Sequence, residues 1–136
     1  MATKIFLNLS VRDLKRSMDF FGKLGFTFNS QFTDEAAACM IISEDIYVML
    51  LTENKFKTFT PKRICDATKC TEILVWLSSG SKNEVNEMVR KAVAAGGTTY
   101  LHVRSRIPGS DGHIWEVVFM EPSATKPACD AIVIGC

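Results

Sequence analysis

A strand-then-helix pattern that occurs twice in the chain is the feature that most constrains its fold. Apolar and polar residues alternate over Lys4–Ser10, and a helix that Asp13 can cap and Gly25 can end follows. In the second half, the same alternation over Glu72–Leu77 precedes a helix that Ser81 can cap. The two patterns are about 66 residues apart, and such a repeat indicates internal duplication.

Further segments typical of strands follow each helix. They are Phe26–Thr33, Ala36–Ile42 and Ile46–Leu51 in the first half, and Thr98–Val103 and Asp111–Met120 in the second. With more strands than helices, the chain is predicted to have an α+β fold. Its 136 residues suffice for one domain with a sizeable core.

The repeat divides the chain into segments with different roles. We predict a module over residues 1–52, a connector over 53–70, a second module over 71–122 and a C-terminal tail over 123–136. A short helical turn is expected at Glu53–Phe56. The apolar end of the tail, Cys129–Cys136, has three open interpretations: a strand added to its own sheet, a strand added to a second subunit, or a disordered end.

Composition excludes several classes of partner. The net charge is +1 and no basic stripe occurs, so nucleic acid is not expected to bind. No apolar run reaches the roughly 20 residues that span a bilayer, and the N-terminal residues do not resemble a signal peptide. We therefore expect a cytoplasmic protein without membrane contacts. The five cysteines include no CxxC pair, which favours reduced thiols over a disulfide framework.

The segment Asp111–Met120 places one carboxylate in an otherwise apolar strand. Asp-Gly is a strong turn signal, and Glu116 follows on the strand that this turn begins. Alternation places Glu116 on the same face as Ile114, and His113 on the other face. A glutamate among apolar side chains is costly to bury unless another group pairs with it. Glu116 is thus a candidate functional residue, whereas His113 is expected to be structural.

Duplication makes positions in the two halves comparable. Phe6 is predicted to correspond to Glu72 on the first strands, and Leu50 to Glu116 on the last strands. If the two sheets curl and face each other, these four side chains point into one cleft, with two carboxylates opposite two apolar groups. Other side chains of the same strands would line the walls: Asn8, Ser10, Val48, Leu74, Trp76 and Val118.

Two motifs make the chain similar to a known superfamily. Val11–Phe21 with Leu24–Phe26 in the first half, and Asp111–Glu116 in the second, resemble the vicinal oxygen chelate superfamily. That superfamily includes glyoxalase I, bleomycin-resistance proteins, fosfomycin-resistance enzymes and extradiol dioxygenases. The resemblance covers residues from about 4 to 122 and implies a glyoxalase-like domain over 1–122, with two βαβββ modules that form a curled mixed sheet, often in a homodimer.

The resemblance also implies a site for a divalent metal, with ligands at the positions of Phe6, Leu50, Glu72 and Glu116. Only Glu72 and Glu116 carry oxygen donors, whereas such sites normally have three protein ligands, so a Mg, Mn, Zn, Ni or Fe site would be incomplete. One hypothesis is a metal-dependent lyase or dioxygenase in which these two glutamates are catalytic. The alternative is a metal-independent protein that binds or sequesters a small molecule, as resistance-type members do.

Substrate-binding candidates come from the same cleft. They are Phe6, Asn8, Leu50 and Trp76, together with Arg104, which could hold an anionic substrate. Other interpretations stay open: the glutamates pair with arginine and only hold the fold, Trp76 belongs to the core, and Arg104 lies on a solvated strand face. The segment between Gly97 and Asp111 is short for this superfamily, and the tail from Cys129 onward could fill the gap that this leaves.

Overall fold

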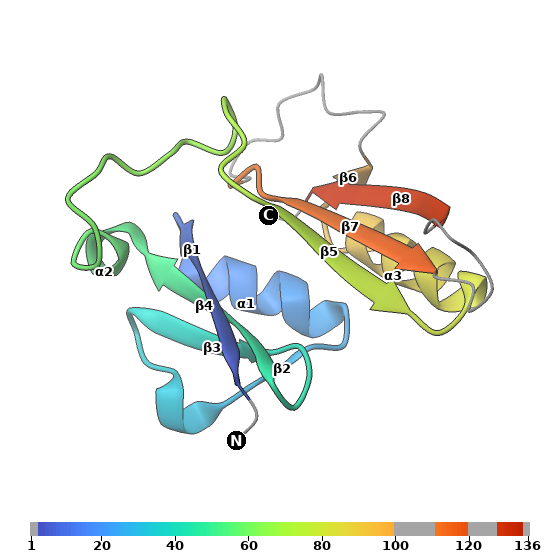
Figure 1. Ribbon diagram of the computed structural model, residues 1–136, viewed down its shortest axis with the longest axis horizontal. Helices are drawn as coiled ribbons and strands as arrows, with labels where there is room; N and C mark the ends of the chain where they lie inside the picture. Colours follow the sequence, from blue (N-terminus) through green and yellow to red (C-terminus); the bar gives the residue numbers. More distant parts are fainter. Residues whose placement is uncertain (1–2, 100–110, 120–127, 135–136) are drawn as a thin grey trace. The chain divides into compact units, whose positions relative to one another are not determined.

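The chain forms two compact units, Met1–Ile64 and Cys65–Cys136. The computed structural model describes residues 3–99, 111–119 and 128–134, the last of these as backbone. Each unit contains a four-stranded sheet with both parallel and antiparallel neighbours, together with helices (Figure 1). The predicted α+β class is confirmed, and each sheet of the described residues is mixed.

The first unit follows the predicted order of elements. Its elements are β1 (Ile5–Val11), α1 (Leu14–Lys23), β2 (Thr27–Phe28), the 3-10 helix η1 (Ser30–Phe32), β3 (Ala37–Ile41), β4 (Ile46–Thr52) and α2 (Glu53–Phe56). The strands lie in the order β1-β4-β3-β2. Strands β1 and β4 are parallel, whereas β3 is antiparallel to both of its neighbours.

Side chains and glycine set the limits of α1 as predicted. The Asp13 carboxylate accepts a hydrogen bond from the backbone N–H of Arg16, which satisfies one donor that the helix leaves unpaired. Gly25 has a φ of +101°, the left-handed conformation that ends a helix at low steric cost. The helix is amphipathic, and it buries Leu14, Phe20 and Phe21.

The predicted strand over Phe26–Thr33 is shorter in the structure, because side chains there compete for the backbone. The Asn29 side chain accepts a hydrogen bond from the N–H of Gln31, which stabilises the 3-10 turn η1. The Thr33 hydroxyl donates to the Asn29 carbonyl and accepts from the N–H of Cys39. The ladder with β3 is therefore limited to Thr27–Phe28, followed by one further backbone hydrogen bond from the Asn29 N–H to the Cys39 carbonyl.

The second unit has the same spatial arrangement of strands, reached by a different chain order. Its elements are β5 (Leu74–Ser79), α3 (Lys82–Ala94), β6 (Thr98–Thr99), β7 (Ile114–Phe119) and β8 (Ala128–Ile134). The sheet order is β5-β7-β8-β6, and β5 is parallel to β7. The Ser81 hydroxyl caps α3 by accepting from the N–H of Glu84, and α3 contacts strands of this sheet (Figure 1).

Strand β8 comes from the C-terminal tail and lies inside this sheet. It is antiparallel to β7 on one side and to β6 on the other, as β3 is to β4 and β2 in the first unit. Of the three interpretations of the tail, the structure agrees with a strand added to its own sheet, and β8 lies in the interior of that sheet rather than at its edge. The predicted strand over Thr98–Val103 is confirmed at Thr98–Thr99, and its remainder is outside the described residues.

The cysteines depart from the prediction of reduced thiols, which is wrong for one pair. Cys65 and Cys70 form a disulfide, with their Cα atoms 6.7 Å apart. A tight turn explains the pairing, because the N–H groups of Lys69 and Cys70 both donate to the Asp66 carbonyl and so bring the chain back on itself. Cys39 is a free cysteine, fully buried in β3.

Candidate functional site

The open face of β1 and β4 carries an exposed aromatic pair. The rings of Phe6 and Tyr47 are stacked, with centroids 4.8 Å apart and planes inclined by 11°. The Lys4 ammonium lies 5.4 Å from the centroid of the Tyr47 ring and 3.6 Å from a carboxylate oxygen of Asp45. Although it is stacked, Phe6 remains 51% exposed. Flat apolar surface is therefore available to a ligand on this face.

Further along the same face, the sheet register pairs Asn8 with Met49. Asn8 is exposed and Met49 half-buried. An amide that can both donate and accept hydrogen bonds thus lies beside a flexible, polarisable side chain. The structure confirms that Phe6 and Asn8 share a face. It adds Tyr47 and Met49, which sequence analysis did not single out because every residue of Ile46–Leu51 is apolar or aromatic.

Leu50 lies on the opposite face, so the prediction that it points the same way as Phe6 is wrong. It is paired in register with Leu9, and both are buried; Leu50 is only 1% exposed. These two leucines belong to the core of the first unit. The uniformly apolar sequence of β4 shows no alternation, so only the pairing with β1 reveals which residues face the core.

The equivalent face of β5 and β7 carries the candidate carboxylate. Trp76 is paired in register with Glu116, and Leu74 with Ile114. Leu74 and Trp76 are 61% and 46% exposed, whereas Glu116 is half-buried. Trp115 and Val117 point to the other face and are buried. The structure therefore brings Glu116 and Trp76 together, and it places Trp76 on an exposed face rather than in the core.

Glu72 is not part of the strand face that carries Trp76 and Glu116, and its carboxylate contacts a different side chain. It precedes β5 by two residues, and its Oε1 is 2.6 Å from Nδ1 of His113. His113 is buried, and it directly precedes β7. The alternative that the glutamate forms an ion pair and holds the fold thus has support for Glu72, with a histidine in place of the expected arginine. Glu72 thus has His113, rather than Glu116, as its observed partner.

The structure also changes which residues of the two halves occupy equivalent positions. Phe6 lies the same number of residues before the N-cap Asp13 as Leu74 lies before the N-cap Ser81. Residues 47–52 and 114–119 have an identical succession of half-buried and buried positions, which aligns Met49 with Glu116. Phe6 therefore corresponds to Leu74 rather than Glu72, and Glu116 corresponds to Met49 rather than Leu50.

These four positions do not suit the divalent metal that the resemblance implies. Phe6, Met49 and Leu74 offer no oxygen or nitrogen donor, and the Met49 thioether is a poor ligand for the hard cations. Glu116 alone supplies an oxygen. In residues 3–99 and 111–119, no group of three or more histidine, cysteine, aspartate or glutamate side chains is arranged to hold a metal ion. Arg104, the candidate for an anionic substrate, lies outside the described residues.

Solved structures with the same architecture define the class of fold. A glyoxalase-related enzyme from Fulvimarina pelagi superposes with a TM-score of 0.68 at 18% identity, covering 96% of this chain and 98% of that one. A hypothetical protein from S. aureus gives a TM-score of 0.66 at 25% identity, covering 86% and 93%. The fosfomycin resistance protein FosX from Listeria monocytogenes gives 0.56 at 16% identity, covering 86% and 90%. The chain has the fold of the glyoxalase/bleomycin resistance proteins.

Sequence comparison points to the same superfamily. Residues 3–43 match the family described as bleomycin resistance protein-like N-terminal. None of the curated proteins matches the chain. The family match and the shared fold confirm the predicted resemblance to the vicinal oxygen chelate superfamily.

Proposed function

We propose that the chain is a metal-independent small-molecule-binding protein of the glyoxalase/bleomycin-resistance type. The observation that carries this proposal is the set of side chains at the equivalent positions of the two open faces. Three of them, Phe6, Met49 and Leu74, are apolar, and Glu116 is the one carboxylate. Such a set favours ligands that are held by stacking and apolar contact rather than by metal coordination.

The pairing of Trp76 with Glu116 indicates the chemical class of ligand. An exposed indole face attracts flat rings and cations, and a neighbouring carboxylate favours a positive charge. The Phe6–Tyr47 pair offers a second flat surface, beside the polar amide of Asn8. We therefore propose flat aromatic or amphipathic ligands that carry a positive charge.

We further propose that the two units are modules of the βαβββ type. The first has that order along the chain. In the second, the place that β3 occupies in the first sheet is taken by β8. This arrangement explains how a second half with a short segment before Asp111 can complete a four-stranded sheet.

A ligand screen tests the binding proposal. Thermal stability is measured with planar cationic dyes such as proflavine, with and without a metal chelator, and binding is followed by quenching of tryptophan fluorescence. We expect stabilisation that the chelator does not reduce. Trp76→Ala should weaken binding by roughly 1–2 kcal/mol, or about five- to thirtyfold in Kd. Phe59→Ala, which removes another exposed aromatic ring, is the matched control and should leave Kd unchanged.

Glu116 supplies a second, independent arm of this screen. Glu116→Gln keeps the shape of the side chain but removes its charge, so it should weaken binding of a cationic dye more than binding of a neutral analogue of the same size. Stabilisation by ligands only when a divalent metal is present would exclude metal-independent binding.

A second candidate function, a metal-dependent lyase or dioxygenase, is favoured by one observation: Glu116 is half-buried on the strand whose Asp-Gly motif resembles the superfamily. Such an enzyme would need further ligands from outside the described residues or from a second subunit. Calorimetric titration with Mn²⁺, Zn²⁺, Ni²⁺ or Fe²⁺ should then detect saturable binding in the wild type that Glu116→Gln abolishes. Titrations without heat beyond dilution would rule it out.

A further inference from the structure

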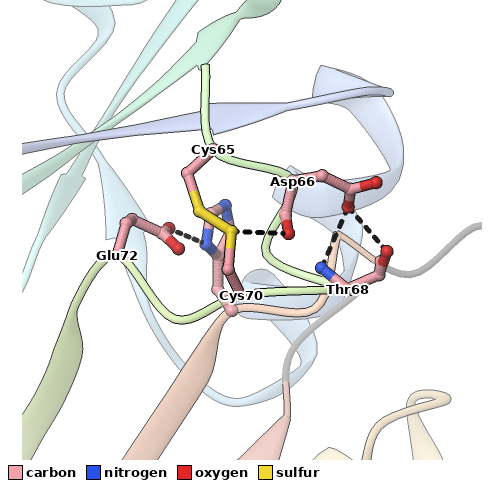
Figure 2. Close-up of a disulfide and its surroundings, with 6 residues drawn as sticks. Cys65, Asp66, Thr68, Cys70 and Glu72 are labelled. Carbon is pink, nitrogen blue, oxygen red and sulfur yellow. Dashed lines mark hydrogen bonds and ion pairs between the residues drawn. A yellow bond between two sulfur atoms is a disulfide. The ribbon is translucent and has the colours of Figure 1, made fainter. Parts of the chain in front are cut away.

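The Cys65–Cys70 disulfide closes a loop that is ordered by its own hydrogen bonds. The Asp66 carboxylate accepts from the N–H and the hydroxyl of Thr68, at 3.0 and 2.6 Å. The Sγ atom of Cys70 lies 3.3 Å from the Asp66 carbonyl oxygen (Figure 2). The four residues between the cysteines thus form a compact turn with the disulfide across its ends.

This loop packs directly on the turn that precedes β7. Gly112 has a φ of +81°, and a Cβ atom placed there would lie 2.5 Å from the Ala67 carbonyl oxygen and 2.6 Å from the Thr68 nitrogen. Only glycine allows the two backbones to come so close. The closed disulfide loop therefore covers the start of the strand that carries Glu116.

The loop also adjoins the contact between Glu72 and the buried His113. Glu72 follows Cys70 by two residues, and its partner His113 directly follows Gly112. His113 is only 7% exposed. Any movement of the loop that carries Glu72 away from the turn before β7 would therefore affect both the burial of His113 and its partner.

The two cysteine residues differ in exposure. Cys70 is exposed and Cys65 is half-buried. Lys69, which is exposed, precedes Cys70 and places a positive charge beside it. An anionic thiol that approaches from solvent would therefore reach Cys70 first.

We propose that this disulfide is a thiol-exchange site, attacked at Cys70 by a small anionic thiol such as glutathione, and that its opening exposes His113. The incoming thiolate forms a mixed disulfide with the sulfur of Cys70, and Cys65 leaves as a thiolate that takes up a proton. A second thiol attacks the bound thiol's sulfur, which releases Cys70 and a disulfide of the small thiol. Two electrons pass from the two small thiols to the protein disulfide.

Hydrogen exchange measured on the full chain tests the opening. Adding reduced glutathione should speed exchange of the peptides that cover residues 65–72 and 111–116 by roughly tenfold or more. The Cys65→Ser/Cys70→Ser variant should exchange fast with or without glutathione. Protection of α3, which lies in the same unit as the disulfide, should stay the same in every sample, which shows that this unit of the variant is folded. Unchanged exchange of both peptides on reduction would overturn the proposal.

Trapping of the mixed disulfide tests the point of attack. Each single variant is treated with oxidised glutathione, and the adduct is located by mass spectrometry. Cys65→Ser should form the adduct at Cys70 faster than Cys70→Ser forms it at Cys65. Equal rates, or a faster reaction at Cys65, would contradict attack at Cys70. Cys39 is the internal control, because burial raises the pKa of its thiol, and it should remain unmodified in both variants.

Discussion

Gly112 illustrates how a single residue permits a close backbone contact. It combines a left-handed backbone with a contact that leaves no room for a side chain. Gly25 has a similar φ but open space around the position of a Cβ atom. Comparing the two glycines therefore distinguishes the cost of backbone strain, which both positions have, from the cost of steric overlap, which only Gly112 has.

We predict that Gly112→Ala lowers the free energy of unfolding by roughly 2–4 kcal/mol, because left-handed strain and a clash with the Ala67 carbonyl add together. Gly25→Ala should cost only about 1–2 kcal/mol, from strain alone. Denaturant unfolding followed by circular dichroism measures both. Equal losses in the two variants would show that the loop near Ala67 moves away without cost.

Glu72 and Glu116, the two candidate glutamates of the second unit, are expected to respond differently to loss of charge. Glu72→Gln should lower stability by about 1 kcal/mol, because it leaves the buried His113 with a weaker partner, although partial exposure of Glu72 limits the effect. Glu116→Gln should weaken ligand binding, which Glu72→Gln should leave unchanged. Tryptophan fluorescence during unfolding reports this unit, since Trp76 and Trp115 both lie in it. Loss of ligand binding in Glu72→Gln but not in Glu116→Gln would reverse these assignments.

At the scale of elements, β8 is the component that completes the second sheet. It pairs with β7 from Ile114 to Phe119 and with β6 at Thr98–Thr99, so without it these two strands would each lose their antiparallel partner. Strand β6 has only two residues, and it pairs with β8 at the edge of the sheet. The tail is therefore expected to be required for folding of this unit rather than to be an accessory.

An engineered disulfide tests the position of β8. The register pairs Val118 with the native Cys129, and cross-strand partners have Cα separations within disulfide range. Val118→Cys should form a disulfide with Cys129 within one chain, detected by peptide mapping without reductant. Ile114→Cys, about 13 Å further along β7, is the control and should form no disulfide with Cys129.

Two results of this experiment would contradict the position of β8. Absence of the Val118→Cys disulfide under oxidising conditions would mean that the register is different. Covalent dimers in place of the intrachain product would mean that the tail pairs with another copy of the chain, the interpretation of the tail that the present structure does not adopt.

At the scale of the whole molecule, no described helix has both the length and the apolar character that crossing a membrane requires. The two compact units each have their own sheet and core. The superfamily resemblance implies a homodimer, and this stays a prediction. Sedimentation equilibrium should give twice the mass of the chain, with dissociation on dilution. A mass equal to one chain at micromolar concentration would count against the dimer.

Much of the fold could be predicted because its signals are local. The caps Asp13 and Ser81, the glycine at position 25 and the helical turn Glu53–Phe56 each follow from a few adjacent residues, and all four are confirmed. Alternation along β1 likewise indicated the shared face of Phe6 and Asn8. These features depend on backbone hydrogen bonds and side-chain periodicity within a short segment, so the sequence alone determines them.

The candidate site depended on long-range pairing, which a single sequence does not contain in readable form. The face of Leu50, the match of Glu116 with Met49, and the contact of Glu72 with His113 all follow from which strand lies beside which, and in what register. The interior position of β8 likewise requires distant segments to meet in space. Because a register shift of one residue exchanges the two faces of a strand, only the tertiary structure decided these points.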